Sequence, residues 1–303
     1  MGTPKFAVPV LSALLDAGHN IVSVYSKPDK PHGRGKHREH TSVKMFTKER
    51  NIPIYQPHSL KAPREQEQLF SLSPDLIVVA AYGLFLPPAI LEVPKLGCLN
   101  VHPSLLPKYR GPAPVSSAIL NGDSVTGVTI MKIEEEMDAG PILTSQPVDI
   151  NPEDNTDGLT MRLFQVGASM MVDSVPKWAS GTLPAFPQNN SKATLTRRLS
   201  KKDGQITWDF HAATIARQVR AYHPWPGTFT HLDGKLLKII DASVIEGQNI
   251  VPGTIMLMSD KRIGISTGCG VLDIRRLQLE GRPIVDSSEF IRGHSHLIGS
   301  IVK

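Results

Sequence analysis

Runs of apolar residues alternate with helical patterns through the first 180 residues of this 303-residue chain. Asp75–Ala81 is nearly all apolar and rich in β-branched residues, which is typical of a strand covered on both faces. Further strands are predicted at Asn20–Tyr25, Asn51–Tyr55, Leu96–Val101 and Thr126–Ile133. Helices are predicted at Val8–Ala17, Val43–Arg50, Pro63–Ser71, Pro88–Leu91 and Val115–Asn121. Strands separated by helices indicate an α/β fold with a doubly wound, mainly parallel sheet.

A different pattern follows from residue 151 onward. Asn151–Ser180 has a polar start and then apolar residues at roughly helical spacing, which predicts one long helix with Thr156 as its N-cap. A stretch rich in Pro, Asn, Ser and Gly comes next. The pattern therefore predicts a first domain over 1–180, a linker over 181–197 and a smaller second domain over 198–303.

The second domain has one predicted helix, Ala212–Ala221, and then short alternating strands. These strands are expected at Thr228–Leu232, Lys235–Ala242, Gly253–Met258, Arg262–Ser266 and Gly270–Leu279. Turn signals recur between them at intervals of about ten residues, which indicates a small β-barrel.

The chain opens with MGTPKFAVP, which begins at a turn. A doubly wound domain normally opens with a buried strand before that turn, so we expect the first strand to be missing. The opening lacks a charged head followed by a long apolar stretch, and no apolar run approaches the roughly 18 residues of a membrane helix. We therefore expect a cytoplasmic protein, whose two cysteines, Cys98 and Cys269, are buried free thiols.

Positive charge is concentrated in two places. The net charge is −1 over residues 1–180 and +6 over 181–303, giving the total of +5. Lys27–Arg50 carries eight Lys and Arg against three acidic residues, and its core, KPDKPHGRGKHREH, contains two Pro and two Gly. We expect this core to lack regular structure. It is either a phosphate-contacting loop or a solvated basic loop, and the C-terminal surplus is either a nucleic-acid surface or an ordinary basic one.

Two polar side chains lie at the end of a predicted strand, where doubly wound sheets bind their ligands. Asn100 and His102 are two residues apart and so point to the same face. An amide donor beside an imidazole suits a carbonyl that becomes tetrahedral, because the donor holds the oxyanion and the base takes a proton. The alternative is that Asn100 caps a turn and His102 bonds backbone.

Asp138 lies in the turn-rich stretch EEEMDAGPIL. It either orients His102 or bonds its own turn. The sequence has no Gly-x-Gly-x-x-Gly after a strand, no phosphate loop and no Gly-x-Ser-x-Gly elbow, which disfavours dinucleotide, ATP and serine-hydrolase chemistry. The histidines of the basic loop have no acid or thiol cluster beside them, so we expect no metal.

Six stretches together resemble the methionyl-tRNA formyltransferase family over essentially the whole chain and in the same order. They are GTPKFAVP, KPDKPHGRGK, VVAAYGLFLP, LNVHPSLLPKYRGPAPV, TGVTIMKIEEEMDAGPIL and RAYHPWPG. The resemblance implies a doubly wound formyl-transfer domain and an OB-like barrel that grips tRNA. It implies 10-formyltetrahydrofolate as the donor, initiator methionyl-tRNA as the acceptor, no membrane partner and a monomer.

Site residues follow from the matching motif positions. The resemblance implies a catalytic role for Asn100, His102 and Asp138. It implies that the folate site is lined by Ser104, Leu105, Leu106, Pro107, Tyr82, Leu84 and Leu86. It implies tRNA contacts for Arg34, Lys36 and Arg38.

Two other functions stay open on the sequence. One is another formyltetrahydrofolate-dependent enzyme, which transfers the formyl group to glycinamide ribonucleotide or a sugar nucleotide, or hydrolyses the donor. The basic loop and the basic second domain argue against it. The other is a non-catalytic RNA-binding protein, which the intact Asn-x-His and Asp argue against.

Overall fold

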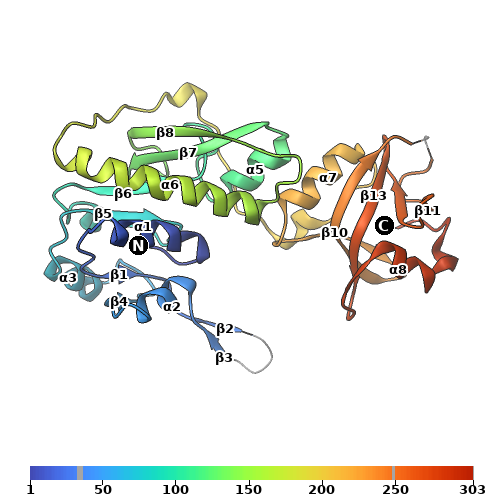
Figure 1. Cartoon of the computed structure of the whole chain (residues 1–303), viewed down its shortest axis with the longest axis horizontal. Helices are drawn as coiled ribbons and strands as arrows, with labels where there is room; N and C mark the ends of the chain where they lie inside the picture. The colour runs from blue at the N-terminus through green and yellow to red at the C-terminus, as the bar shows by residue number, and fades with distance from the viewer. Residues whose placement is uncertain (33–36, 248–249, 303) are drawn as a thin grey trace. The chain divides into compact units, whose positions relative to one another are not determined.

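The computed structural model describes residues 1–32, 37–247 and 250–302. The chain forms two compact units, which are described separately below (Figure 1). Unit 1 comprises Met1–Pro114, Val125–Asp149 and Thr160–Thr196, and unit 2 comprises Val115–Ser124, Ile150–Leu159 and Arg197–Lys303.

The sheet of unit 1 has four strands in the order β5-β6-β7-β8. Their bounds are Ile77–Ala80, Cys98–His102, Val125–Lys132 and Ile142–Asp149. β5 and β6 run parallel, whereas β6–β7 and β7–β8 are antiparallel, so the sheet is mixed. β8 was not predicted, because its side chains are mostly exposed and Pro147 interrupts its pattern. Pro147 is accommodated because β8 forms the edge of the sheet.

The helices within the first 180 residues lie at or near their predicted positions. They are α1 (Val8–Asp16), α2 (Ser42–Lys48), α3 (Pro63–Ser71), α4 (Pro88–Leu91), α5 (Pro114–Asn121) and α6 (Thr156–Ala179). A short 3₁₀ turn, Lys5–Ala7, precedes α1, and another spans Asn190–Lys192. The α/β fold class of this unit is confirmed.

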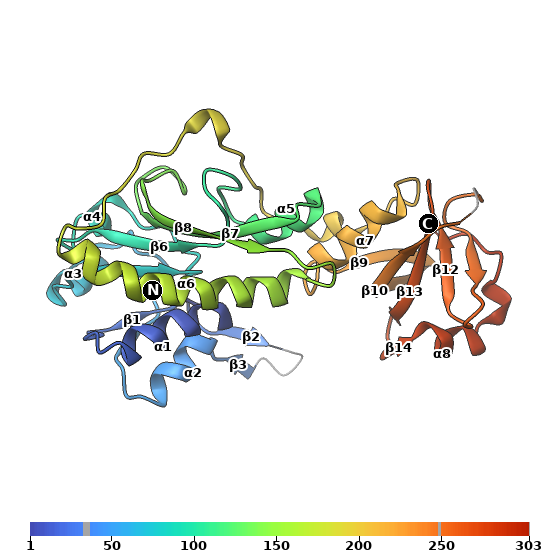
Figure 2. The same cartoon turned by 45° about the horizontal axis from the view of Figure 1, so that its top comes forward.

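The long helix α6 packs against β6–β8 (Figure 2). Its contact with β6 is close, since a Cβ on Gly167 would lie 2.4 Å from Val101 Cγ1. The expected cap is wrong: Asn155 Oδ1 accepts a hydrogen bond from the Gly158 amide at 2.9 Å, whereas the Thr156 hydroxyl donates to the Ala221 carbonyl. Both residues are suitable N-caps, and they differ by one position.

Met1 and Gly2 join the four-stranded sheet to a separate parallel pair, β1 (Val24–Tyr25) and β4 (Ile54–Tyr55). The Gly2 amide donates to Tyr25 O, and the Ala80 amide donates to Met1 O, each at 2.9 Å. Beside this junction lies a cavity of about 590 Å³, lined mainly by apolar side chains of α1, β1 and β5.

The basic loop contains regular structure, contrary to expectation. β2 (Lys30–His32) and β3 (His37–Glu39) form an antiparallel hairpin. Pro31 is accommodated because a two-stranded hairpin consists only of edge strands.

Unit 2 is built on a curled antiparallel sheet in the order β11-β12-β13-β10-β9, with β14 also paired to β13 (Figure 1). Its strands are β9 (Thr228–Leu232), β10 (Lys235–Ile245), β11 (Ile255–Leu257), β12 (Ile263–Ser266), β13 (Val271–Leu279) and β14 (Ile284–Asp286). The sheet is an open half-barrel, because β9 and β11 each pair with only one other strand among the described residues. Its remaining elements are α7 (Ala212–Ala221), α8 (Ser287–Arg292) and two 3₁₀ turns (Lys201–Gly204 and Ser295–Leu297).

Both cysteines are free thiols, but their environments differ. Cys98 is buried on β6, and burial raises the pKa of its thiol to about 12. Cys269 is exposed, so the expectation that it is buried was wrong. It lies in the turn between β12 and β13, where the Thr267 hydroxyl accepts from its amide at 3.3 Å. Within the described part of the chain, no helix combines the length and the apolar character needed to cross a membrane.

Candidate functional site

β6 carries Asn100 and His102 at its carboxyl end. Their side chains share one face, because residues two apart in a strand point the same way. β6 is an inner strand, with Asn100 paired to Val79 on β5 and to Met131 on β7. The backbone that carries both side chains is therefore held by a sheet that is hydrogen-bonded on either side.

His102 is buried and uses one ring nitrogen for the backbone. Its Nε2 lies 3.0 Å from the Tyr109 carbonyl oxygen, which can only accept, so Nε2 carries the proton. The other nitrogen, Nδ1, lies 3.7 Å from Asp138 Oδ1. This distance is longer than a direct hydrogen bond. It leaves room for a water molecule or a substrate atom to bridge the two groups.

The protonation state of His102 suits the role of a general base. Burial lowers the pKa of His102, and the Asp138 carboxylate raises it by a smaller amount, so the net direction is downward. The imidazole is therefore neutral at pH 7, and Nδ1 offers a lone pair toward Asp138.

Asp138 lies in the turn between β7 and β8. Its backbone has a φ of 51°, in the left-handed region that Asp tolerates better than most residues. Oδ2 accepts from the Gly111 amide at 2.8 Å, which leaves Oδ1 facing His102. Its carboxylate thus bonds the loop after β6, and in the described part of the chain it accepts no hydrogen bond from its own turn.

Asn100 is half-buried. Across the described residues its carboxamide has no hydrogen-bond partner, so the structure does not show it capping a turn. A carboxamide has two N–H donors, and here both are available to a ligand on the face shared with His102.

The loop after β6 is fixed by Thr129 of β7, which lies opposite His102 in the ladder. Thr129 Oγ1 donates to Ser104 O at 2.7 Å and accepts from the Leu106 amide at 3.1 Å. The Leu106–Pro107 peptide bond in this loop is cis. Sequence reasoning missed Thr129, although a polar residue within the apolar stretch GVTIMK is a signal that could have identified it.

The expected folate residues differ in accessibility. β5 and β6 run parallel, so the loops that carry these residues leave the same end of the sheet. Ser104 is buried and its hydroxyl donates to Lys108 O at 2.7 Å, while Leu106 is also buried. Tyr82 and Leu86 belong to the apolar core, and no partner of the Tyr82 hydroxyl is found among the described residues. The half-buried members are Leu84, Leu105 and Pro107.

A segment predicted as a linker contacts this site. We call residues 186–196 the strap; Figure 2 shows this stretch passing on the side of the sheet opposite α6. Thr194 Oγ1 accepts from the Tyr109 amide at 2.8 Å, and the Thr196 amide donates to Arg110 O at 2.7 Å. A Cβ on Gly111 would lie 2.8 Å from Thr196 O. The strap therefore lies directly on the loop after β6.

Only one of the three expected tRNA contacts lies among the described residues. Arg34 and Lys36 lie outside the described residues, and Arg38 belongs to β3. Sequence reasoning missed Asp29 at the base of the hairpin. Its carboxylate accepts from His40 at 2.7 Å, Gln56 at 2.8 Å and Lys44 at 2.5 Å. Burial would raise the pKa of Asp29, but these hydrogen bonds outweigh it and hold the pKa well below its usual range.

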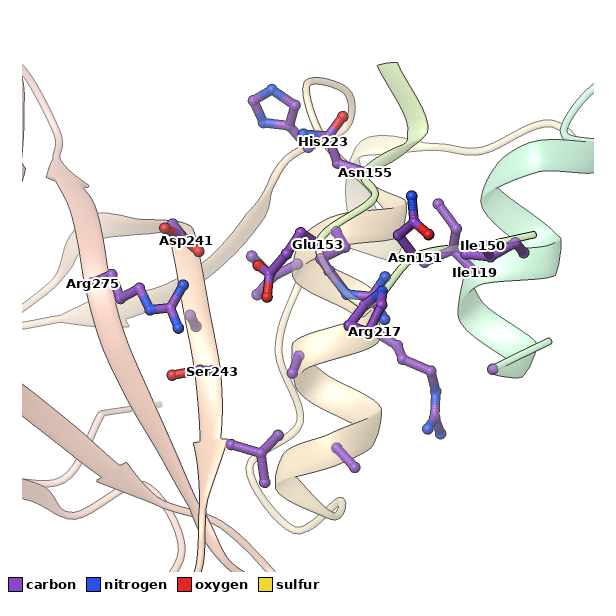
Figure 3. A pocket seen from close by; sticks show the side chains of 18 of the residues that line it. Ile119, Ile150, Asn151, Glu153, Asn155, Arg217, His223, Asp241, Ser243 and Arg275 are labelled. Atoms are coloured by element: carbon purple, nitrogen blue, oxygen red, sulfur yellow. The ribbon is translucent and has the colours of Figure 1, made fainter. Parts of the chain in front are cut away.

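A second cavity, of about 750 Å³, lies in unit 2 between α7, β10 and the segment before α6 (Figure 3). Its charged lining includes Arg217, Arg275, Asp241 and Glu153. Arg217 Nε donates to Leu120 O at 3.1 Å, so this guanidinium holds elements of unit 2 together. The cavity contains none of the three residues expected to be catalytic.

The chain is similar to known formyltransferases along nearly its whole length. The methionyl-tRNA formyltransferase of Dehalococcoides mccartyi is 42% identical over 300 residues, which cover 99% of this chain and 96% of the relative. That of Chloroflexus aurantiacus is 44% identical over 296 residues, covering 97% and 95%. The N-formyltransferase of Helicobacter canadensis, solved with folinic acid and dTDP-3-aminofucose, superposes with a TM-score of 0.65 at 19% identity, covering 90% and 96%.

Family models match both parts of the chain. The model described as "Formyl transferase" matches residues 1–175, which include Asn100, His102 and Asp138. The model described as "Formyl transferase, C-terminal domain" matches residues 198–295. With more than half of its length in the first match and relatives above 40% identity along nearly all of it, the chain belongs to the formyl transferase family.

Proposed function

We propose that this protein transfers the formyl group of 10-formyltetrahydrofolate to the α-amino group of methionine esterified to initiator tRNA. The observation that carries this is the Asn100 carboxamide, which has no hydrogen-bond partner among the described residues and shares a face of β6 with His102, whose Nδ1 faces Asp138. The relatives named methionyl-tRNA formyltransferase support the acceptor, since they match nearly the whole chain. We further propose that the protein is a cytoplasmic monomer.

The site residues fit the chemistry of an acyl transfer. The donor supplies an electrophilic formyl carbon when bound. Asn100 is placed to donate to the formyl oxygen as negative charge develops there. His102 Nδ1 accepts the proton that the attacking amine loses, and Asp138 stabilises the imidazolium that results. A C–N bond to the acceptor forms, the bond from the formyl carbon to the donor nitrogen breaks, and His102 returns the proton to that nitrogen.

Binding of the donor is proposed for the loops after β5 and β6. Leu84, Leu105 and Pro107 are half-buried and provide apolar surface at the same end of the sheet. Ser104 and the buried core residues Tyr82, Leu86 and Leu106 shape these loops from within.

Binding of tRNA is proposed for two regions. One is the basic hairpin of the catalytic domain, residues 1–180. The other is the domain over 198–303, for which the charge supports a polyanionic partner: residues 181–303 contain 16 Lys and Arg against 10 Asp and Glu.

The proposal is tested by supplying 10-formyltetrahydrofolate and four acceptors in parallel. These are initiator methionyl-tRNA, a dTDP-amino sugar, glycinamide ribonucleotide and water alone. Formylmethionyl-tRNA should form fastest by orders of magnitude. Preferential formylation of the sugar nucleotide or ribonucleotide, or donor hydrolysis without an acceptor, would assign the protein to another branch of the family, and no turnover at all would contradict the enzymatic function.

Replacing Arg34, Lys36 and Arg38 together by Ala should weaken tRNA binding in a salt-dependent way. Each lost phosphate contact makes the slope of log K against log[salt] shallower by about 0.7–0.9, so three lost contacts predict about two to three units. Filter binding across a salt series measures this. The control removes three exposed cations of unit 1 elsewhere, Arg64, Lys95 and Lys177. Equal slopes for the two triple variants would contradict the assignment.

A further inference from the structure

The strap reaches the Asp138 turn through one side chain. Gln188 Nε2 donates to the carbonyl oxygens of Asp138 and Gly140, both at 2.8 Å. Its Oε1 accepts from Arg110 Nε at 2.9 Å. A single half-buried carboxamide therefore links the turn that carries Asp138 to the loop after β6.

The Asp138 turn has little freedom of its own. Asp138 has a positive φ, and a Cβ on Gly140 would lie 2.0 Å from Lys132 O at the end of β7. The two carbonyls that Gln188 binds flank this strained stretch. Without the Gln188 donors they would lose these hydrogen bonds, and the turn would be less constrained.

Arg110 fixes Gln188 in turn. The Arg110 side chain is only 4% exposed, and its Nη2 donates to Asn190 Oδ1 at 2.7 Å. The backbone beside Arg110 holds both catalytic partners, since Tyr109 O accepts from His102 and the Gly111 amide donates to Asp138 Oδ2. The contacts thus form a closed ring from His102 through this loop and Gln188 to Asp138.

We propose that Gln188 is a positioning residue that sets the orientation and distance of the Asp138 carboxylate relative to His102. The strap is then part of the catalytic machinery, although it touches no reacting atom. This inference rests on the proposed function for its kinetic readout. The Asp138 carboxylate raises the pKa of His102, so displacement of that carboxylate has a second readout that needs no substrate.

The test compares Gln188→Ala with Gln66→Ala, which removes a half-buried carboxamide of α3 whose Nε2 also donates to two backbone carbonyls, Leu60 O and Lys61 O. Gln188→Ala should lower kcat about 10- to 100-fold, because small displacements of catalytic groups have effects of that size. KM for tRNA and for the formyl donor should stay within about twofold. Gln66→Ala should change kcat by less than about threefold.

NMR titration of His102 without substrate gives the second readout. In Gln188→Ala the His102 pKa should fall below that of the unmodified protein, and in Gln66→Ala it should not move. If Gln188→Ala does not fold, Gln188→Met replaces it in both measurements, because methionine retains the length of the side chain. A lower melting temperature with unchanged kcat and an unchanged His102 titration would overturn the proposal. Failure of tRNA formylation by the unmodified protein would overturn the proposed function, and the titration would still decide the role of Gln188.

Discussion

Asn100→Ala is expected to lower kcat by about two to three orders of magnitude while leaving the affinity for methionyl-tRNA within about twofold. The reason is that one oxyanion donor contributes about 3–4 kcal/mol to stabilisation of the transition state. Asn100 is the donor, because its carboxamide is unpartnered within the described ranges and shares a face of β6 with His102. Single-turnover formylation with saturating donor and tRNA measures the chemical step.

The same structure predicts that this variant folds normally. Since the Asn100 side chain forms no hydrogen bond within the described chain, its removal should change the melting temperature by only a few degrees. Asn20→Ala, at an exposed position, is the matched control and should retain full activity. An Asn100→Ala protein of near-normal rate would remove Asn100 from the mechanism.

Asp138→Asn is expected to lower kcat/KM about 100-fold or more at pH 7.5, because general base catalysis contributes about two to four orders of magnitude. The substitution keeps an oxygen for the Gly111 amide but removes the charge that faces His102 Nδ1. Asp173→Asn, which removes an exposed carboxylate from α6, is the control for charge and should have no effect.

The effect of Asp138→Asn on kcat/KM should also depend on pH in a definite direction. Burial lowers the pKa of His102, so kcat/KM of the unmodified protein should be lost as pH falls through a value below 6.5. Without the Asp138 charge that pKa falls further, and the acid limb of the variant moves to lower pH. The ratio of variant to unmodified kcat/KM should therefore rise as pH falls. An acid limb of the variant that lies at the same pH as that of the unmodified protein, or at higher pH, would show that Asp138 does not act through His102.

The sequence predicts the elements that a local pattern defines. β5 and β6 are apolar runs, and α3, α4 and α7 have the bounds expected from helical spacing and from proline at the start of α3 and α4. The pairing of Asn100 and His102 on one face also follows from strand periodicity alone. Strand periodicity does not give the proximity of His102 to Asp138. That proximity depends on the pairing of β7 with β6, which brings the turn after β7 close to His102.

The missed features depend on contacts between distant residues. β8 has an ordinary edge-strand environment. Pro147 interrupts its sequence pattern, so the pattern does not predict a strand there. The strap has no hydrophobic pattern, because its contacts are hydrogen bonds between polar residues, such as Gln188 with Arg110, that are 78 residues apart. Pro, Asn and Ser are enriched in flexible linkers and in ordered polar segments alike, so composition does not separate the two.

The strap also changes where the protein is vulnerable. A protease that cuts once after Ala179 and before Gln188 would leave every strand of unit 1 intact. Release of the downstream end would nevertheless free the Tyr109 amide and the Asp138 carbonyl from their partners. A nicked molecule of this kind would retain its fold and lose turnover. Cleavage of this segment would therefore abolish activity while the rest of the structure survives.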